Sequence, residues 1–131
     1  MIHAVIDTNV LVSALLTSKP DAATVQILDA VMNGQIIPIY NEEIISEYEM
    51  VLNRPTFGFP EDMVYYYINA IKEKGILTTR ILSDEHFPDP NDTVFYEVAL
   101  SVHNAYVITG NLKHFPNTPI VITPAQLLDK L

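Results

Sequence analysis

Residues 2–9, IHAVIDTN, contain the pattern from which the fold can be predicted. The first five, Ile2–Ile6, are nearly all apolar and include β-branched side chains, which is typical of a strand buried on both faces of a sheet. Asp7 follows at once, and Asn9 opens a segment, residues 9–16, with the composition of a helix. We therefore expect a buried strand, a polar residue at its end and a helix, which is how an α/β sheet begins.

The rest of the chain continues this alternation. Further strands are expected at residues 36–40, 76–82, 106–109 and 120–122, and further helices at residues 20–33, 41–52, 60–74 and 91–104 and from residue 123 onward. Asn41 is placed to cap one of these helices, and Gly34 and Gly75 are placed to end two others. Strands separated by helices predict an α/β fold with a central, mostly parallel sheet of about five strands and helices on both faces. No repeat or linker interrupts the pattern, so we expect a single domain over residues 1–131.

Composition excludes several classes of protein. The apolar fraction of 49% is enough for a core and argues against disorder. Sixteen acidic against seven basic side chains give a net charge of −9, so nucleic acid could be bound only locally or with the help of a metal. Cysteine is absent, which excludes disulfides and thiolate metal sites and agrees with a cytoplasmic location. No apolar run approaches the ~20 residues of a membrane span, and the start lacks the pattern of a signal peptide.

Polar side chains recur where the predicted strands end. Asp7 follows the first strand, Glu47 lies in the helix after the second, Asp89 and Asp92 open the helix before the fourth, and Asn111 follows the fourth. In parallel sheets the functional groove lies outside the carboxyl ends of the strands. All five residues are oxygen donors, which favour Mg²⁺ or Mn²⁺, and crowded carboxylates need a cation to offset their repulsion.

Each of these residues also has a purely structural interpretation. Asp7 and Asp89 could cap helices, and Asp92 could reach back to complete a capping box. Glu47 could be a solvated flank of an amphipathic helix, and Asn111 could be a turn residue. Taken singly the five are weak signals, and their shared position at strand ends is what favours a functional site.

Four segments carry a resemblance to a known family. They are residues 5–14 (VIDTNVLVSA), 45–55 (ISEYEMVLNRP), 89–95 (DPNDTVF) and 107–111 (VITGN). In order and spacing they resemble PIN-domain proteins, in particular the VapC-like toxin ribonucleases of bacterial toxin–antitoxin pairs. The resemblance implies a compact three-layer α/β/α fold, an acidic pocket that binds one or two Mg²⁺ or Mn²⁺ ions, and endonucleolytic cleavage of RNA.

The resemblance also implies roles for individual residues. By motif position it assigns catalytic and metal-binding roles to Asp7, Glu47 and Asp92. It thereby favours Glu47 over Glu49, and it makes Asn9 and Thr109 positioning residues. Asn111 departs from the pattern, because many members of the family carry an acid there; the amide oxygen could still bind a metal, and Asp89 could restore the missing charge.

The same reasoning suggests partners and leaves alternatives open. Arg54 and the pair Lys113-His114 could bring positive charge to an RNA substrate, although both could be ordinary solvated side chains. A cognate antitoxin is implied by the resemblance, and a homodimer is plausible. One alternative is a catalytically silent PIN module that binds RNA or a protein. Another is a phosphoacceptor receiver domain, for which Lys113 is the only candidate lysine and Asp84 comes too late to end the third strand.

Overall fold

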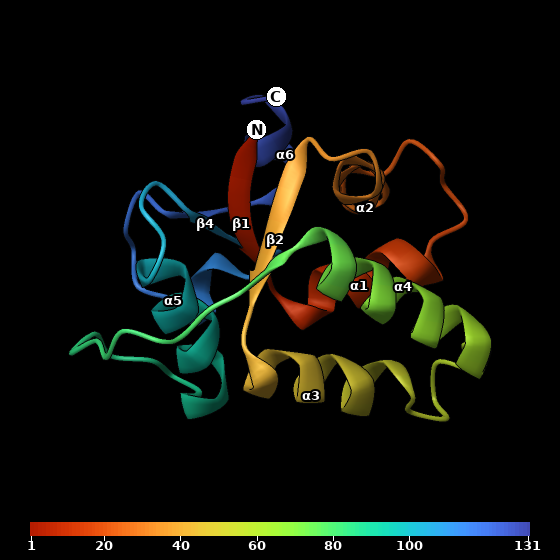
Figure 1. Ribbon diagram of the computed structural model, residues 1–131, viewed down its shortest axis with the longest axis horizontal. Coiled ribbons are helices and arrows are strands. Elements are labelled where there is room, and N and C mark those ends of the chain that lie inside the picture. Colours follow the sequence, from red (N-terminus) through yellow and green to blue (C-terminus); the bar gives the residue numbers. More distant parts are fainter.

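The computed structural model describes all 131 residues, and its centre is a five-stranded sheet in which every neighbouring pair of strands is parallel (Figure 1). The strands are β1 (Ile2–Ile6), β2 (Ile36–Tyr40), β3 (Ile76–Leu77), β4 (Tyr106–Ile108) and β5 (Val121–Ile122). The helices are α1 (Thr8–Leu16), α2 (Ala23–Met32), α3 (Glu42–Leu52), α4 (Glu61–Lys74), α5 (Thr93–Leu100) and α6 (Pro124–Leu128). Two 3₁₀ turns, η1 (Pro90–Asp92) and η2 (Leu112–His114), complete the chain.

The strand order β3-β2-β1-β4-β5 determines where a site can form. The chain crosses the sheet from β1 to β3 in one direction and then returns to place β4 on the other side of β1. Right-handed crossovers in opposite directions put their helices on opposite faces, and α5 lies on one side of the sheet with α1, α2 and α4 on the other (Figure 1). The prediction of a mostly parallel sheet of about five strands between helical layers is confirmed. The order reverses between β1 and β4, the switch point at which such sheets bind ligands.

The core follows from the apolar strands at the centre of the sheet. Val5 and Ile6 of β1 and Val107 and Ile108 of β4 are all fully buried, as the near-absence of polar residues in these strands predicts. The buried Tyr48 of α3 donates its hydroxyl to the carbonyl oxygen of Ile6 and so fixes α3 against the end of β1. None of the helices has the length and apolar character needed to cross a membrane.

Local signals explain several element ends. Asn41 caps α3 as predicted, with its Oδ1 accepting from the backbone N–H of Ile44 at 2.9 Å. Gly34 ends the α2 region with φ of +85°, a conformation that favours glycine. Gly75 ends α4 for a different reason: a Cβ at this position would lie 2.4 Å from the carbonyl oxygen of Pro38.

Three predicted boundaries were wrong. Only Ile76 and Leu77 of the run 76–82 form a strand, because β3 is an edge strand whose single neighbour is β2, and the chain then runs irregularly to η1. The helix expected at 20–33 begins at Ala23, because residues 19–22 form a turn in which the N–H of residue 22 binds the carbonyl of residue 19. The helix expected at 91–104 ends at Leu100, and its first residues belong to η1.

Candidate active site at the carboxyl edge of the sheet

The first acid of the site lies at the switch point between β1 and β4. Asp7 follows β1, is 4% exposed and accepts a hydrogen bond at its Oδ2 from the hydroxyl of Thr109, which follows β4 (2.8 Å). The same hydroxyl oxygen accepts from the backbone N–H of Asn111 at 3.0 Å. Asp7 occupies the N-cap position of α1, but its side chain makes no capping bond. Its carboxylate is therefore held by the neighbouring strand rather than used to cap the helix.

Burial acts on the charge of this carboxylate. The pKa of Asp7 is raised above its ordinary value chiefly by desolvation. The hydrogen bond from Thr109 and the nearby His114 both favour the ionised form and oppose this rise in pKa. Nothing else in the site brings a strong positive charge to Asp7, so a bound cation would stabilise its ionised form.

The second acid comes from α3. Glu47 is half-buried, and its Oε2 accepts a hydrogen bond from the hydroxyl of Thr8, the residue next to Asp7 (3.0 Å). Glu49, on the opposite flank of α3, is exposed and borders a groove between α3 and α4. The structure thus turns Glu47, and not Glu49, toward the end of β1.

The third acid is Asp92, at the junction of η1 and α5. Its Oδ2 is buried and accepts no hydrogen bond. Burial, followed by the negative charges of Asp7, Asp89 and Glu47, raises the pKa of Asp92 to about 6, against an opposing effect of His114. Because buried polar atoms are almost always paired, an orphaned carboxylate oxygen among other acids is the kind of group that a cation satisfies.

The remaining two predicted donors behave differently. Asp89 caps η1 by accepting from the backbone N–H of Asn91 at 2.9 Å, which is the structural interpretation of this residue, whereas Asp92 forms no capping box. Asn111 is exposed, and its side-chain nitrogen lies 3.1 Å from Nε2 of His114. His114 in turn points Nδ1 toward Oδ2 of Asp92 at 3.5 Å. The predictions that Asp89 and Asn111 bind a metal remain predictions.

Whether these residues fit a metal ion depends on the kind of site considered. As the side chains stand, no group of three or more histidine or acidic side chains could hold a metal ion. Mg²⁺, however, is usually bound by one or two carboxylates, with water and substrate phosphate supplying the other ligands. The unpaired Oδ2 of Asp92 meets that smaller requirement. The residues therefore fit an ion whose coordination the substrate completes, and they do not form a closed metal cage.

The predicted positioning residues are only partly brought together. Thr109 contacts Asp7 as described, and the exposed Asn9 lies in the first turn of α1 beside the site. Lys113 is exposed in η2 next to His114. Arg54 lies beyond the end of α3, seven residues after Glu47, which is about 10 Å along a helix axis. The structure does not bring Arg54 to the carboxylates.

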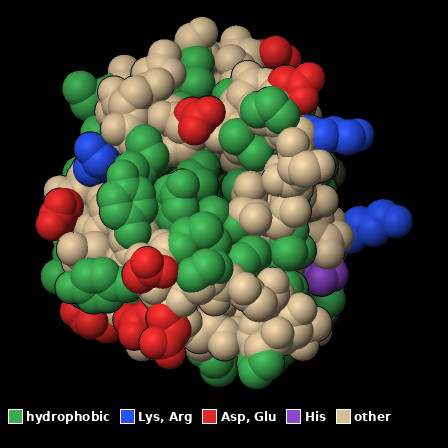
Figure 2. Space-filling model, turned by 90° about the vertical axis from the view of Figure 1, so that its right-hand side faces the viewer, with side chains coloured by type: hydrophobic (Ala, Val, Ile, Leu, Met, Phe, Trp, Pro, Cys, Tyr) green, Lys and Arg blue, Asp and Glu red, His purple; other side chains and the backbone are tan.

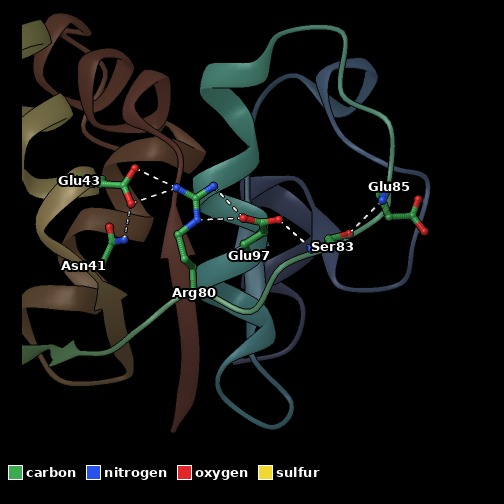
Figure 3. Close-up of polar contacts among 6 residues, drawn as sticks. All are labelled: Asn41, Glu43, Arg80, Ser83, Glu85 and Glu97. Carbon is green, nitrogen blue, oxygen red and sulfur yellow. Dashed lines mark hydrogen bonds and ion pairs between the residues drawn. The ribbon is translucent and has the colours of Figure 1, made fainter.

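An ion-pair network that the sequence analysis did not predict borders this edge (Figure 3). Nη1 of Arg80 contacts both carboxylate oxygens of Glu43 at 2.8 and 2.9 Å, and its Nε donates to Glu97 at 2.8 Å. The other oxygen of Glu97, a residue only 2% exposed, accepts from the backbone N–H of Ser83 at 2.7 Å. The network ties the irregular segment after β3 to α3 and α5. Glu97 stands alone in the apolar run 94–100 (VFYEVAL), a pattern that indicates a buried acid with a partner.

A parallel five-stranded sheet, with Asp7 at the switch point between β1 and β4 and Asp92 near enough for their charges to interact, defines an α/β protein with an acidic carboxyl edge. Comparison with known families agrees with this description. The family model of the PIN domain matches residues 3–113, so the chain belongs to the PIN-domain family, whose members are in general nucleases acting on RNA or DNA. No curated protein and no solved structure matches the chain.

Proposed function

We propose that the protein is a metal-dependent endoribonuclease that hydrolyses RNA phosphodiester bonds. The observation that carries the proposal is the buried, unpaired Oδ2 of Asp92, a carboxyl whose pKa is raised first by burial and then by the charges of Asp7, Asp89 and Glu47. Such an arrangement is unfavourable in the free protein and becomes favourable when a divalent cation and a phosphate are present.

Each residue has a defined part in this proposal. Asp7 and Asp92 supply the carboxylates that hold Mg²⁺ or Mn²⁺, with Glu47 beside them and Thr109 fixing the orientation of Asp7. When bound, the ion supplies charge neutralisation for the phosphate and activation of a water molecule. Asn111 brings no negative charge, so a second ion, if one binds, is held more weakly than the first.

The charge of the protein restricts where RNA can approach. With a net charge of −9, most of the surface repels a polyanion. The exposed Lys113 next to the site and the bound ion offset this repulsion locally. We therefore expect contact with RNA to be confined to the few nucleotides around the cleaved bond.

A role as the toxin of a toxin–antitoxin pair extends the proposal to a protein partner. Figure 2 shows the face on the side of α4, where apolar side chains gather and acidic side chains border them. Leu16, Tyr65 and Tyr66 are 54%, 70% and 57% exposed on α1 and α4. These exposed side chains support contact with an antitoxin or with a second copy of the chain. We propose that the activity is exerted in the cytoplasm, where cellular RNA is accessible.

A catalytically silent PIN module that binds RNA or a protein is the second candidate. Two observations favour it: Asn111 stands where many members of the family carry an acid, and the acidic side chains form no preformed metal site. In that case the protein would bind RNA, or a protein through the exposed apolar side chains of α1 and α4, without hydrolysing RNA.

Cleavage of labelled RNA separates the two candidates. A panel of single-stranded and hairpin RNAs is incubated with the protein and Mn²⁺, Mg²⁺ or EDTA. We expect cleavage only with a divalent ion, and loss of at least about a hundredfold in rate for Asp7→Asn and Asp92→Asn. Asp29→Asn is the matched control, since Asp29 is an exposed acid near the end of α2, at the opposite edge of the sheet. RNA left intact after long incubation with both ions would favour the silent module.

A further inference from the structure

We infer that the groove between α3 and α4 is a docking site for a basic amphipathic helix of a partner protein. The inference names the chemistry of that partner and so rests on the partner role in the proposed function, whereas it does not depend on the hydrolysis of RNA. None of the residues that line the groove belongs to the candidate active site.

The groove follows from the packing of the two helices. α3 and α4 lie side by side and run in opposite directions, so the last turn of α3 meets the first turn of α4 (Figure 1). The groove between them has a volume of about 660 Å³. Its floor contains the buried Val64 and Ile68, and its lining includes Tyr65, which is 70% exposed. From Glu61 to Lys72 the lining extends for about 16 Å along α4, the length of about three helical turns.

The charges of the groove are unevenly distributed. Three carboxylates, those of Glu49, Glu61 and Asp62, lie where the two helices meet, and Lys72 lies near the other end of α4. All four side chains are exposed, and none of them forms an ion pair within the chain. The groove therefore has an acidic end and a basic end, with apolar side chains between them.

These charges decide between the possible occupants. RNA is a polyanion, and the three carboxylates at one end of the groove repel it. A second copy of the chain has no matching segment, because of its seven basic side chains only Lys72 and Lys74 lie close together in the sequence, and both belong to α4 itself. A complementary segment carries several lysines or arginines at one end and an apolar stripe beside them. It therefore belongs to a different protein.

An amphipathic helix matches both the shape and the chemistry of the groove. Its apolar side chains recur every three or four residues on one stripe, which can pack along Tyr65 and the apolar floor. Exposed tyrosines are common anchors of protein interfaces, and complementary charges at one end determine the direction in which the helix docks. On the side of α4 apolar side chains gather and acidic side chains border them, a pattern that suits a partner with apolar and basic side chains (Figure 2).

Selection from an unbiased peptide library tests the inference with the full chain and without RNA. The probe is a phage library of random helix-forming peptides of about 12 residues, which as helices span the groove. Selected peptides are sequenced, synthesised with a fluorescent label and titrated by anisotropy at low and high salt. We expect them to carry apolar residues at helical spacing with an excess of lysine and arginine at one end.

Matched variants of α4 show whether the peptides bind in the groove. Tyr65→Ala should weaken binding by at least about tenfold, whereas Tyr66→Ala, an exposed neighbour that does not line the groove, should weaken it by less than about threefold. Glu61→Gln combined with Asp62→Asn should weaken binding by at least about fivefold and remove most of its salt dependence. Glu73→Gln, an exposed acid of α4 outside the groove, should do neither. Because the replaced side chains are exposed, the urea midpoints should stay unchanged.

The outcomes separate this inference from the proposed nuclease. Selected peptides that are neutral or acidic, peptides whose binding is the same in all of these variants, or a library that yields no binder would overturn the docking site. Displacement of the peptides by equimolar spermine would also overturn it, because the groove would then be a site for small cations. RNA cleavage by a protein with no such binders would leave the nuclease standing, and binders in the groove without RNA cleavage would leave the docking site standing.

Discussion

The substitution Asp92→Asn should make the metal-free protein more stable at neutral pH. The carboxylate of Asp92 is largely buried, lacks a hydrogen-bond partner at Oδ2 and lies among other negative charges, so ionising it costs free energy in the folded state. The amide has nearly the same shape and carries no charge. A residue that weakens the fold in this way is kept for a reason other than stability, and the reason proposed here is metal binding.

The magnitude follows from the pKa. The pKa of Asp92 is raised from 3.8 to about 6 in the folded protein, and each pH unit between the two values is worth about 1.4 kcal/mol, so the upper limit is about 3 kcal/mol. Solvent reaches the open side of the pocket and screens the charge, so we expect a gain of about 1 to 2 kcal/mol in the free energy of unfolding. Because the pKa of Asp92 is raised in the folded state, its protonated carboxyl contributes its full share to the free energy of unfolding below about pH 4. This stabilisation is lost as the pH rises through about 6.

Urea unfolding of both proteins in EDTA, at pH 4 and pH 7.5, measures the difference. Asp92→Asn should gain stability relative to the unaltered protein at pH 7.5 and little or none at pH 4. Asp29→Asn, which removes an exposed acid, should show no such pH dependence. Added Mn²⁺ should stabilise the unaltered protein and not Asp92→Asn. Equal destabilisation of Asp92→Asn at both pH values would refute the reasoning, because it would mean that the carboxylate makes a favourable native contact.

Two further stability predictions concern features outside the three acids. Arg80→Ala should lower the free energy of unfolding by about 3 kcal/mol, measured by thermal or urea unfolding, because it leaves the buried carboxylate of Glu97 without its cationic partner. Glu43→Gln, at the exposed end of the same network, should lower it by less than about 1 kcal/mol. Gly75→Ala should lower the free energy of unfolding by about 1 to 3 kcal/mol, because its new Cβ would overlap the backbone oxygen of Pro38 in β2. Gly110→Ala should leave stability nearly unchanged, because no heavy atom lies within 4 Å of the new Cβ. Equal losses of stability in the two variants would contradict the packing argument.

The fold could be predicted from the sequence where burial alone determines the pattern. The segment Ile2–Ile6 is nearly all apolar because helices cover both faces of the sheet around β1 (Figure 1), and Asn41 caps α3 through a bond within its own turn. Residues 76–82 failed as a strand prediction because the β-rich composition of the run does not reveal how many neighbours it has. The edge position of β3 leaves its side chains exposed and only two residues paired.

The site was predictable where a residue follows a strand directly, and less so where tertiary packing decides. Asp7 and Thr109 were each expected at the end of a strand, and the structure places these strands side by side, so that the two residues form a hydrogen bond. Arg54 was expected near the site because it closes a motif, but the axis of α3 carries it away. His114 was considered only as a positive charge for an RNA substrate, because the sequence does not show that η2 turns its ring toward Asp92. Partners that meet through a turn of irregular backbone leave no periodic signal.

Anomalous diffraction from crystals grown with Mn²⁺ is the most direct test of the idea that these separated acids share a divalent ion. We expect an anomalous peak within bonding distance of Oδ2 of Asp92, with oxygens of Asp7 or Glu47 bound directly or through one water molecule. Crystals that show no peak near Asp92 at millimolar Mn²⁺, with the three carboxylates separately hydrated, would contradict it.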